Sequence, residues 1–469
     1  MRIFGQGAVM LTLAMSALAI KSIEIKGNAF YENGTDSRFY MKGIDYQPGG
    51  SSGVSDPLAD KDTCERDIKY FKKLGINTIR VYSIDNSKSH KECMSQLADA
   101  GIYVIADVNT PKASINNAQP KCSYNAKYLN EVFAAVKEMS QYDNTLGVFA
   151  ANEVISDKPS TLQAAPYAKA VVRDIKKYLK NNGLRRIPVG YSAADVASNR
   201  LQTALYFNCG DDEDARVDMF GYNDYSWCGD SSFEQSGWDS KVKAYSNYTR
   251  PIFLSEFGCN KQRPRKFSSV KALFSDKMSG VYSGGLVYEY SEESNDYGLV
   301  KVSNDSSEVK TNDDFDYLAK AYNNTKPPSG DGGAHTDKSD ANSCPGKSKD
   351  WNITSTDLPE TPKAAQEYIN GTATPKGLGL GTSTMFSCSE DDNEEVPSDQ
   401  KNSDSSSSSS SSGGSSSSGG SSSGSGSLSS GSSSSSSGGS KSGKKKSGAS
   451  GISASVLATF TAYMISLLL

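Results

Sequence analysis

The feature that most constrains the fold of this chain is a series of eight short apolar runs, each ending in polar or aromatic residues. The runs are Phe39–Tyr46, Asn77–Tyr82, Ile102–Val108, Gly147–Glu153, Ile187–Ser192, Val217–Asn223, Pro251–Glu256 and Gly284–Tyr290. Amphipathic stretches with apolar residues at helical spacing lie between several of them, for example Glu65–Leu74 and Tyr128–Met139. Strands that alternate with helices predict an α/β fold whose parallel sheet closes into a (β/α)8 TIM barrel. An open doubly wound sheet also fits the alternation, but no G-x-G-x-x-G motif follows the first run.

The first residues have the organisation of an export signal. Arg2 provides a positive charge, Ala8–Leu18 is short and mostly apolar, and Ala17 and Ala19 place small residues where a signal peptidase cleaves. The apolar stretch is too short to span a bilayer. We therefore expect residues 1–19 to be a signal peptide that is removed, rather than a buried first strand or helix.

The other end of the chain carries a signal for membrane attachment. Ile452–Leu469 is apolar apart from a few hydroxyl groups, and small residues that include Ser447 and Gly448 precede it. This arrangement predicts a glycosylphosphatidylinositol (GPI) attachment signal over residues 448–469, with the lipid anchor at Ser447 or Gly448. An ordinary tail-anchored helix is the alternative. A GPI anchor would hold the protein on the outer face of the plasma membrane. The sequence does not distinguish a protein that stays on the membrane from one that is transferred to the cell wall.

Composition divides the rest of the chain into a folded part and a stalk. Residues 20–345 have the length of one (β/α)8 barrel, and residues 346–389 are expected to form an extension on or near it. Residues 390–447 are first acidic and then almost wholly Ser and Gly. Such a segment has too little apolar surface to offset the entropy of ordering, so it predicts a disordered stalk.

The cysteines and glycosylation motifs agree with a secreted protein. An even number of cysteines in an oxidising compartment predicts disulfides and leaves their connectivity open. The eight cysteines are Cys64, Cys93, Cys122, Cys209, Cys228, Cys259, Cys344 and Cys388. Six Asn-X-Ser/Thr motifs predict attachment of glycans. Their asparagines are Asn33, Asn247, Asn304, Asn323, Asn352 and Asn370.

The small number of histidines and the net charge argue against several kinds of functional site. His90 and His335 are the only histidines, and no cysteine pair has zinc-ligand spacing, which disfavours a metal site or a Ser-His-Asp triad. A net charge of −4 provides no basic surface for nucleic acid. We expect no metal, no cofactor and no nucleic-acid partner, and a protein that acts as a monomer.

Two glutamates lie at the ends of apolar runs, where the active site of a TIM barrel is built. Glu153 follows Asn152 at the end of the fourth run, and Glu256 ends the seventh. Two carboxyl groups facing each other can cleave a glycosidic bond, one as proton donor and the other as nucleophile or base. Asn152 could then bond the 2-hydroxyl of the sugar. For either glutamate alone, a salt bridge or a solvated loop position is the alternative.

Around these motifs the chain resembles the fungal GPI-anchored β-1,3-glucanosyltransferases, a family of retaining enzymes with barrel folds that elongate cell-wall glucan. The matching stretches are RFYMKGIDYQPGG (Arg38–Gly50), NTIRVYSID (Asn77–Asp85), YVIADVNTP (Tyr103–Pro111), FAANEV (Phe149–Val154), FGYNDYSWCG (Phe220–Gly229), FLSEFGC (Phe253–Cys259) and GGLVYEYSEESNDYGLV (Gly284–Val300). The resemblance covers residues 22–380, and the export signal, Ser-rich stalk and anchor signal are family features too.

The resemblance implies roles for the matching residues. Glu153 would be the acid/base, Glu256 the nucleophile and Asn152 the ligand of the 2-hydroxyl. The other implied substrate-binding residues are Gln47, Tyr82, Asp107, Tyr222 and Tyr288. Core or rim packing is the alternative for each tyrosine. A groove for an acceptor chain is expected from Tyr225, Trp227, Tyr290 and Tyr297.

The cysteine pattern of the family implies three disulfides and a branch within the family. The pairs would be Cys64–Cys93, Cys209–Cys344 and Cys228–Cys259, with Cys122 and Cys388 left to pair with each other. Only Cys388 follows Cys344, so the chain resembles the branch that lacks a cysteine-rich carbohydrate-binding module.

The activity implied by the resemblance is internal cleavage of β-1,3-glucan and transfer of the new reducing end to a second glucan chain, with retention of configuration. The expected partners are therefore a donor and an acceptor glucan. Retention would place the two carboxyl groups roughly 5 Å apart. The residues alone do not distinguish transfer from hydrolysis, because both reactions use the same groups. A retaining β-glucan hydrolase and a non-catalytic glucan-binding wall protein are the rival interpretations, although a binder needs no paired glutamates.

Overall fold

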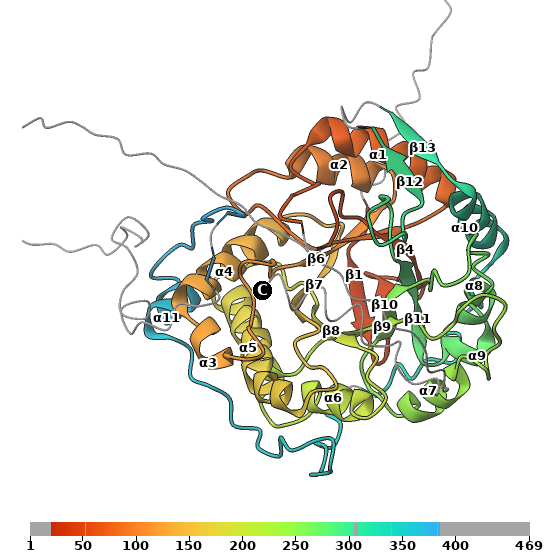
Figure 1. Ribbon diagram of the computed structural model, residues 1–469. Helices are drawn as coiled ribbons and strands as arrows, with labels where there is room; N and C mark the ends of the chain where they lie inside the picture. Colours follow the sequence, from red (N-terminus) through yellow and green to blue (C-terminus); the bar gives the residue numbers. More distant parts are fainter. Residues whose placement is uncertain (1–19, 52, 304–307, 339, 382, 385–469) are drawn as a thin grey trace, which may run out of the picture. The chain divides into compact units, whose positions relative to one another are not determined.

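Eight parallel strands close into a barrel in the structure, a computed structural model that describes residues 20–51, 53–303, 308–338, 340–381 and 383–384 (Figure 1). The strands are β4 (Met41–Asp45), β5 (Thr78–Val81), β6 (Tyr103–Asp107), β7 (Thr145–Asn152), β8 (Val189–Ala194), β9 (Met219–Asp224), β10 (Ile252–Phe257) and β11 (Tyr282–Val287). Each strand pairs with the next one along the chain, and β11 pairs with β4 to close the sheet. The predicted TIM barrel is confirmed, and every predicted apolar run contributes a strand.

Several expectations lie outside the described residues. They are the signal peptide, the stalk, the anchor signal, Cys388 and Asn304.

Helices follow the barrel strands and surround the sheet (Figure 1). They are α1 (Lys61–Leu74), α2 (Lys91–Asp99), α3 (Pro120–Ser123), α4 (Ala126–Met139), α5 (Ala165–Asn181), α6 (Arg200–Phe207), α7 (Trp238–Tyr245), α8 (Ser269–Leu273), α9 (Asp276–Ser279) and α10 (Asp313–Asn324), with the 3-10 turns η1 (Pro159–Ala164) and η2 (Glu213–Ala215). Helix α4 shows why such sequences form the outer layer: Leu129, Val132 and Phe133 recur at helical spacing and are fully buried. A short hairpin of β12 (Val300–Val302) and β13 (Val309–Thr311) precedes α10.

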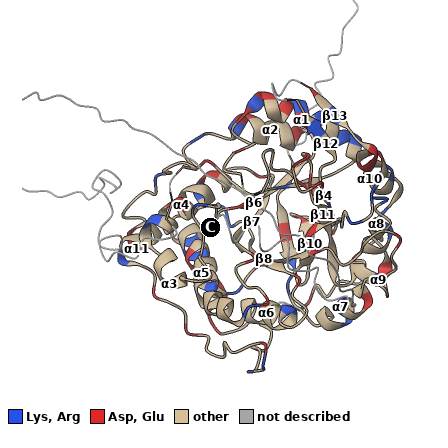
Figure 2. Ribbon diagram, in the orientation of Figure 1, with Lys and Arg blue, Asp and Glu red and all other residues tan. Residues whose placement is uncertain are grey.

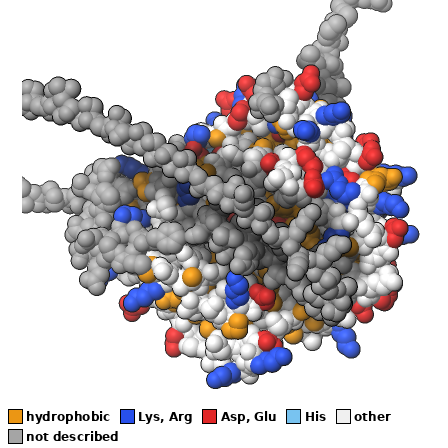
Figure 3. Space-filling model, viewed as in Figure 1, with side chains coloured by type: hydrophobic (Ala, Val, Ile, Leu, Met, Phe, Trp, Pro, Cys, Tyr) orange, Lys and Arg blue, Asp and Glu red, His pale blue; other side chains and the backbone are white. Residues whose placement is uncertain are grey.

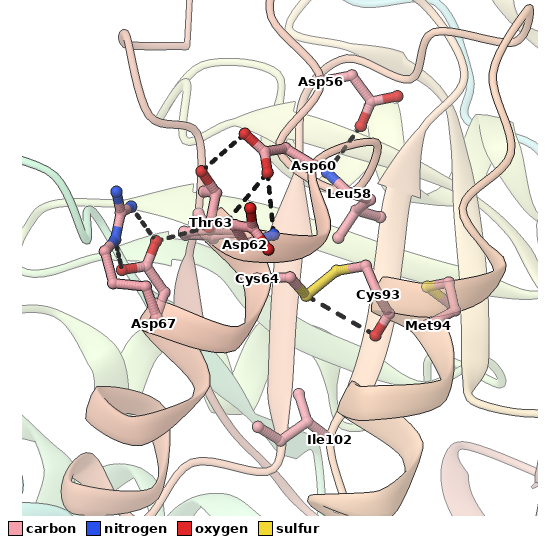
Figure 4. The surroundings of a disulfide bond; sticks show 12 residues. Asp56, Leu58, Asp60, Asp62, Thr63, Cys64, Asp67, Cys93, Met94 and Ile102 are labelled. Atoms are coloured by element: carbon pink, nitrogen blue, oxygen red, sulfur yellow. Dashed lines mark hydrogen bonds and ion pairs between the residues drawn. A yellow bond between two sulfur atoms is a disulfide. The ribbon is translucent and has the colours of Figure 1, made fainter. Parts of the chain in front are cut away.

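Helix α1 is fixed at both ends and is joined to α2 by a disulfide (Figure 4). Asp60 caps its first turn by accepting hydrogen bonds from the backbone N–H groups of Asp62 and Thr63. Gly75 ends the helix with φ of 73°, a conformation that costs glycine little. The expected pair Cys64–Cys93 links the two helices.

The interior of the barrel has an apolar layer and a polar layer. Side chains alternate along a strand, so residues two apart point the same way. The apolar layer contains Met41, Met219 and Phe253 near the amino ends of their strands, together with Ile105, Phe149 and Leu286. Toward the carboxyl ends the buried side chains are polar: Asp45, Arg80, Asp107, Ser192, Asn223 and Ser255. The carboxyl end is therefore the chemically active end.

An antiparallel sheet packs against the apolar layer at the amino end. It consists of β1 (Ile23–Lys26), β2 (Ala29–Glu32) and β3 (Arg38–Phe39). The ring of Phe30 lies 6.0 Å from that of Phe253, centroid to centroid. The predicted run Phe39–Tyr46 is divided, because Phe39 pairs with Phe30 in this sheet whereas Met41 begins the barrel strand.

The segment after the barrel packs on its outer helices. Its helix α11 (Lys363–Ile369) places Tyr368 against Phe133 of α4, with ring centroids 6.3 Å apart. Arg173 of α5 donates hydrogen bonds to the Pro359 carbonyl at 2.8 Å and to the Thr361 hydroxyl at 3.0 Å. Described residues after the barrel therefore contact α4 and α5.

The surface carries charges of both signs and few apolar side chains. Figure 2 shows basic and acidic residues side by side on outer helices such as α1 and α5. On the described part of the face in Figure 3, apolar side chains are scattered among polar ones. Five of the glycosylation-motif asparagines are exposed, namely Asn33, Asn247, Asn323, Asn352 and Asn370. Within the ranges that the structure describes, no helix has the length and apolar character needed to cross a bilayer.

A buried histidine joins three segments outside the barrel sheet. His90 lies 2.6 Å through Nε2 from Asp56 Oδ2, in the loop after β4, and 3.0 Å through Nδ1 from Glu138 Oε1 of α4. Asp56 also accepts the backbone N–H of Asp85, and Glu138 accepts the hydroxyl of Tyr142. Burial opposes the charged imidazole, but the two carboxylates prevail and raise the pKa of His90 to about 9. His90 also helps to lower the pKa of Glu138 to about 2.

This cluster predicts a loss of stability at alkaline pH. The pKa of His90 is raised on folding, so its contribution is complete below the ordinary histidine pKa and disappears as pH rises through about 9. The expected loss in the free energy of unfolding is on the order of 3 kcal/mol. Urea unfolding at a series of pH values should show this decline in the parent protein and not in His90→Gln. His335→Gln is the control and should behave like the parent; parallel curves for parent and His90→Gln would contradict the assignment.

Candidate active site

Glu153 and Glu256 are presented by the carboxyl ends of β7 and β10. Glu256 lies within β10 and is 8% exposed, whereas Glu153 follows directly after β7. A register irregularity between Phe149 and Asn152 bends the end of β7. Glu153 then adopts a left-handed conformation with φ of 51°, which is unfavourable for a residue with a side chain. Its backbone N–H is held by the carbonyl of Ser192 at 2.9 Å.

Arg80 of β5 joins most of the polar groups at this end of the barrel. Its guanidinium is fully buried and donates to both oxygens of Asp107, at 3.0 and 2.9 Å. It also donates to Glu256 Oε1 at 3.1 Å and to Asn152 Oδ1 at 3.1 Å. The rings of Tyr82 and Phe149 lie 4.3 and 4.9 Å from the guanidinium carbon. The planar fork of arginine suits this arrangement, because lysine cannot reach several acceptors at fixed angles.

Glu256 accepts two further hydrogen bonds, both from tyrosines. Tyr82 donates to Oε1 at 2.8 Å, and Tyr225 donates to Oε2 at 2.7 Å. Together with Arg80, these groups provide three donors around one carboxyl group. Hydrogen bonds to the charged form favour ionisation, so Glu256 is arranged to be the carboxylate.

Glu153 has a different environment. It accepts one hydrogen bond, from Asn223 Nδ2 at 2.9 Å. The same amide nitrogen lies 3.3 Å from Asn152 Oδ1, while Asn223 Oδ1 accepts from the hydroxyls of Ser192 and Ser255. Because the amide oxygen of Asn152 can only accept and the two serine hydroxyls donate to Oδ1, the Asn223 amide has a single sensible orientation.

Burial raises the pKa values of both glutamates. For Glu256 the pKa rises to about 7, since burial and the nearby Glu153 outweigh the opposing effects of Arg80, Tyr225 and Tyr82. For Glu153 burial likewise raises the pKa against Asn223 and Arg80. Two buried carboxyl groups that repel each other titrate as a pair, and the proton stays where fewer donors stabilise the charge. Fewer donors surround Glu153, so the hydrogen bonds favour the proton on Glu153 and the charge on Glu256.

The structure brings most of the expected substrate-binding residues to this site. Tyr82 and Asp107 contact Glu256 and Arg80 as described. Gln47 accepts the backbone N–H of Tyr82 at 3.0 Å and thereby supports that strand end. Tyr288 packs edge-on against Tyr82, with centroids 6.4 Å apart, and its hydroxyl lies 2.9 Å from Ser51 Oγ.

The structure places Tyr222 elsewhere. It is 2% exposed in the layer between barrel and helices, where its hydroxyl donates to the Arg200 carbonyl at 2.7 Å and accepts from Tyr245. Side chains alternate along β9, so its neighbour Asn223 faces the glutamates instead.

The four expected groove residues also separate. Tyr290 is buried outside the barrel and bonds Asp67 of α1 at 2.8 Å. Trp227 is half-buried against Trp238. Tyr225 and Tyr297 do lie at the site, with ring centroids 5.5 Å apart, and Tyr297 also contacts Tyr288 at 5.3 Å.

Disulfides support the loops around the site. Cys228–Cys259 joins the loop after β9, which carries Tyr225, to the loop after β10. Cys209–Cys344 is also present, as expected. Cys122 is disulfide-bonded as well, and its expected partner Cys388 lies outside the described residues. In the part of the chain that the structure describes, no group of three or more His, Cys, Asp or Glu residues is arranged to hold a metal ion.

Sequence reasoning assigned no role to Arg80 and Asn223, and it placed Tyr225 in the acceptor groove rather than against Glu256. Arg80 is a charged residue inside the apolar run TIRV, and such a residue requires a buried partner. That signal marks Arg80 as unusual but names none of its partners. Asn223 and Tyr225 lie in a polar strand end where sequence alone does not show which residue faces inward.

A barrel whose carboxyl end presents two glutamates in unequal hydrogen-bonding surroundings is typical of an enzyme that cleaves glycosidic bonds with paired carboxyl groups. Sequence comparison specifies the family. The family profile described as Glucanosyltransferase matches residues 12–326, and this chain belongs to that family.

Individual relatives extend over most of the chain. The 1,3-beta-glucanosyltransferase PGA4 of Candida albicans is 57% identical over 82% of this chain and 84% of its own length. The 1,3-beta-glucanosyltransferase gel1 of Aspergillus fumigatus is 53% identical over 80% of this chain and 81% of its own. A solved structure of a Saccharomyces cerevisiae Gas2p mutant in complex with laminaritetraose and laminaripentaose is similar, with a TM-score of 0.67 and 39% identity over 73% of this chain and 75% of that one.

We predict that Arg80→Lys inactivates the enzyme without unfolding it. A lysine cannot hold Asp107, Glu256 and Asn152 together, so kcat should fall at least roughly a hundredfold through misplacement of the nucleophile. Arg173→Lys is the matched control, because Arg173 is also buried beside an aspartate but lies on α5. The test is to measure kcat and the thermal unfolding temperature of both variants. Equal losses of kcat would contradict the role of Arg80.

We also predict that Tyr225→Phe shifts the pH–rate profile. Loss of its hydrogen bond raises the pKa of Glu256, which must be ionised to react, so the acidic limb of kcat/KM moves to higher pH. At the optimum, kcat/KM should fall roughly tenfold to a hundredfold. Tyr222→Phe removes a hydroxyl outside the barrel and should leave the acidic limb in place. A shift in Tyr222→Phe and none in Tyr225→Phe would reverse the two assignments.

Proposed function

We propose that this protein is a cell-surface 1,3-β-glucanosyltransferase that elongates and remodels cell-wall β-1,3-glucan. The observation that carries the proposal is the unequal pair of glutamates. Three donors stabilise charge on Glu256, and one amide contacts Glu153. Membership of the glucanosyltransferase family, and relatives with that name at more than half identity, supply the substrate.

In the first step, a carboxylate oxygen of Glu256 attacks the anomeric carbon of an internal glucose unit. The glycosidic bond breaks, and Glu153 gives its proton to the departing oxygen, so the reducing-end fragment leaves with a hydroxyl group. Asn152, fixed by Arg80, is positioned to bond the 2-hydroxyl of the reacting sugar. The product is a glycosyl ester of Glu256 with inverted configuration.

In the second step, the 3-hydroxyl of another glucan chain attacks the same carbon. Glu153, now a carboxylate, takes the proton of that hydroxyl, and Glu256 leaves as a carboxylate. Esterification has meanwhile removed the negative charge of Glu256, so the charge that forms on Glu153 no longer faces a second carboxylate. A second inversion restores the β-linkage.

Transfer competes with hydrolysis at this second step, since water could attack in place of the sugar. An acceptor held in attack geometry can outcompete bulk water because its effective molarity reaches on the order of 10⁵ M. The rings of Tyr225, Tyr288 and Tyr297 contact one another beside Glu256 and provide apolar walls with polar tips. Such surfaces suit pyranose rings, whose faces are apolar and whose edges carry hydroxyls.

The proposed placement follows from the ends of the chain. Export by residues 1–19 and replacement of residues 448–469 by a GPI anchor would leave the barrel and its extension at the outer membrane surface. The Ser- and Gly-rich residues before the anchor would separate the active site from the lipid and bring it to wall glucan.

Product analysis tests the activity. The secreted domain, incubated with a reduced β-1,3-gluco-oligosaccharide, should form products longer than the starting material, and Glu256→Gln should form none because an amide does not replace the nucleophile. Only shorter products from the parent would identify a hydrolase. Measurable turnover by Glu256→Gln would refute the assignment of the nucleophile.

A matched variant separates the two roles. Glu153→Gln cannot protonate a departing sugar, but a glycosyl fluoride needs no such help. With a β-laminaribiosyl fluoride donor, Glu153→Gln should accumulate the glycosyl–Glu256 ester, detected as a mass increase of the protein. Accumulation in Glu256→Gln and not in Glu153→Gln would exchange the roles.

A further inference from the structure

Residues 376–381, which we call the rim segment, follow α11 and attach to the first half of α4. Lys376 donates its backbone N–H to Asn130 Oδ1 at 3.1 Å, and Leu378 donates its backbone N–H to Glu131 Oε1 at 3.1 Å. In a TIM barrel, the helix after a strand begins at the carboxyl end of the sheet. The rim segment is therefore held at the same end of the barrel as the active site.

The rim segment also contacts loops that continue directly from active-site residues. Gly377 lies so close to Asn86, in the loop after β5, that a Cβ there would be 2.5 Å from the backbone carbonyl of Asn86. Gly379 lines a small cavity whose wall includes Asp107, the partner of Arg80. The segment thus lies immediately behind the strand ends that carry Tyr82 and Asp107.

Two exposed apolar side chains lie on this end of the barrel. Among the described residues, the large hydrophobic side chains counted as exposed are Leu378 at 49%, Val54 at 39% and Tyr317 at 38%. Leu378 belongs to the rim segment, and Val54 to the loop between β4 and α1, which also carries Ser51. Tyr317 lies on the outer helix α10.

We propose that Leu378 and Val54 bind sugar rings of the glucan chain remote from the cleaved bond. The inference rests on the proposed β-1,3-glucan substrate and adds where that polymer is held beyond the reacting sugar. A chain cleaved internally must extend past the mouth of the barrel on both sides of the glutamates, and the two residues lie on segments at that mouth.

The backbone around Leu378 makes it suitable for this role. Its N–H is bonded to Glu131, which itself accepts from Asn86 Nδ2 at 2.9 Å, so the side chain is presented by a fixed main chain. A contact surface ordered in advance loses less entropy on binding. The apolar faces of pyranose rings gain by covering it, because apolar area is removed from water on both partners.

Binding of laminari-oligosaccharides of increasing length to inactive Glu256→Gln protein tests the proposal by calorimetry. Leu378→Ser and Val54→Ser, each added to this background, should leave Kd for the disaccharide unchanged. They should raise Kd for a heptasaccharide roughly threefold to tenfold. Tyr317→Ser is the matched control, since it removes an equally exposed apolar side chain from α10 and should change neither value.

Displacing the main chain provides a second comparison. Gly377→Val must move the rim segment away from Asn86 and should reproduce the loss for long oligosaccharides. Gly381→Ala meets nothing within 4 Å and should bind like the parent.

The outcomes distinguish this inference from the proposed function. If Leu378→Ser and Val54→Ser bind the heptasaccharide as tightly as the parent, the proposed contacts are wrong although the substrate stands. If affinity for short and long chains falls equally, the residues act only through the fold, which also overturns the proposal. If the parent binds no laminari-oligosaccharide of any length, the proposed substrate fails and this inference fails with it.

Discussion

The active end of this barrel depends on one buried guanidinium. Arg80 holds Asp107 through two hydrogen bonds, Glu256 through one and Asn152 through another, with its plane against two aromatic rings. An arginine inside a barrel is tolerable only if its charge is neutralised and its donors are used. Asp107 and Glu256 neutralise the charge of Arg80 and accept its hydrogen bonds. Glu256 is therefore held in position before any sugar binds. Positioning of this kind lowers the barrier without reorganisation during the reaction.

The same arrangement gives Glu153 and Glu256 different surroundings, although both are glutamates. Both glutamates are buried, which alone would favour protonation of each. Three donors around Glu256 and one amide at Glu153 make the difference, since they stabilise charge on Glu256 more than charge on Glu153. The amide of Asn223 is oriented by two serine hydroxyls on neighbouring strands. The surroundings therefore distinguish two glutamates that are chemically identical.

The rest of the fold covers the amino end of the barrel and leaves the carboxyl end accessible to substrate. The β1–β3 sheet packs against the apolar layer at the amino end, with Phe30 against Phe253, so substrate must approach from the carboxyl end. Around that end, Cys228–Cys259 joins the two loops beside Glu256. The segment after the barrel adds a further contact there through Leu378 and Glu131. Residues beyond the barrel strands and their helices therefore also contact the active end of the barrel.

The sequence by itself predicted the barrel from the spacing of apolar residues and the two glutamates from motifs at strand ends. The pairing of six cysteines followed from the resemblance to the family. The sequence did not determine which side of a strand a residue occupies. Tyr222 and Asn223 are neighbours, and only the register of β9 in the closed sheet turns Asn223 toward Glu153 and Tyr222 toward Tyr245. Likewise, the bonds of Arg80 join strands that are far apart in sequence. Tertiary structure decided these points, because register and barrel closure are set by pairing between strands and not within any one strand.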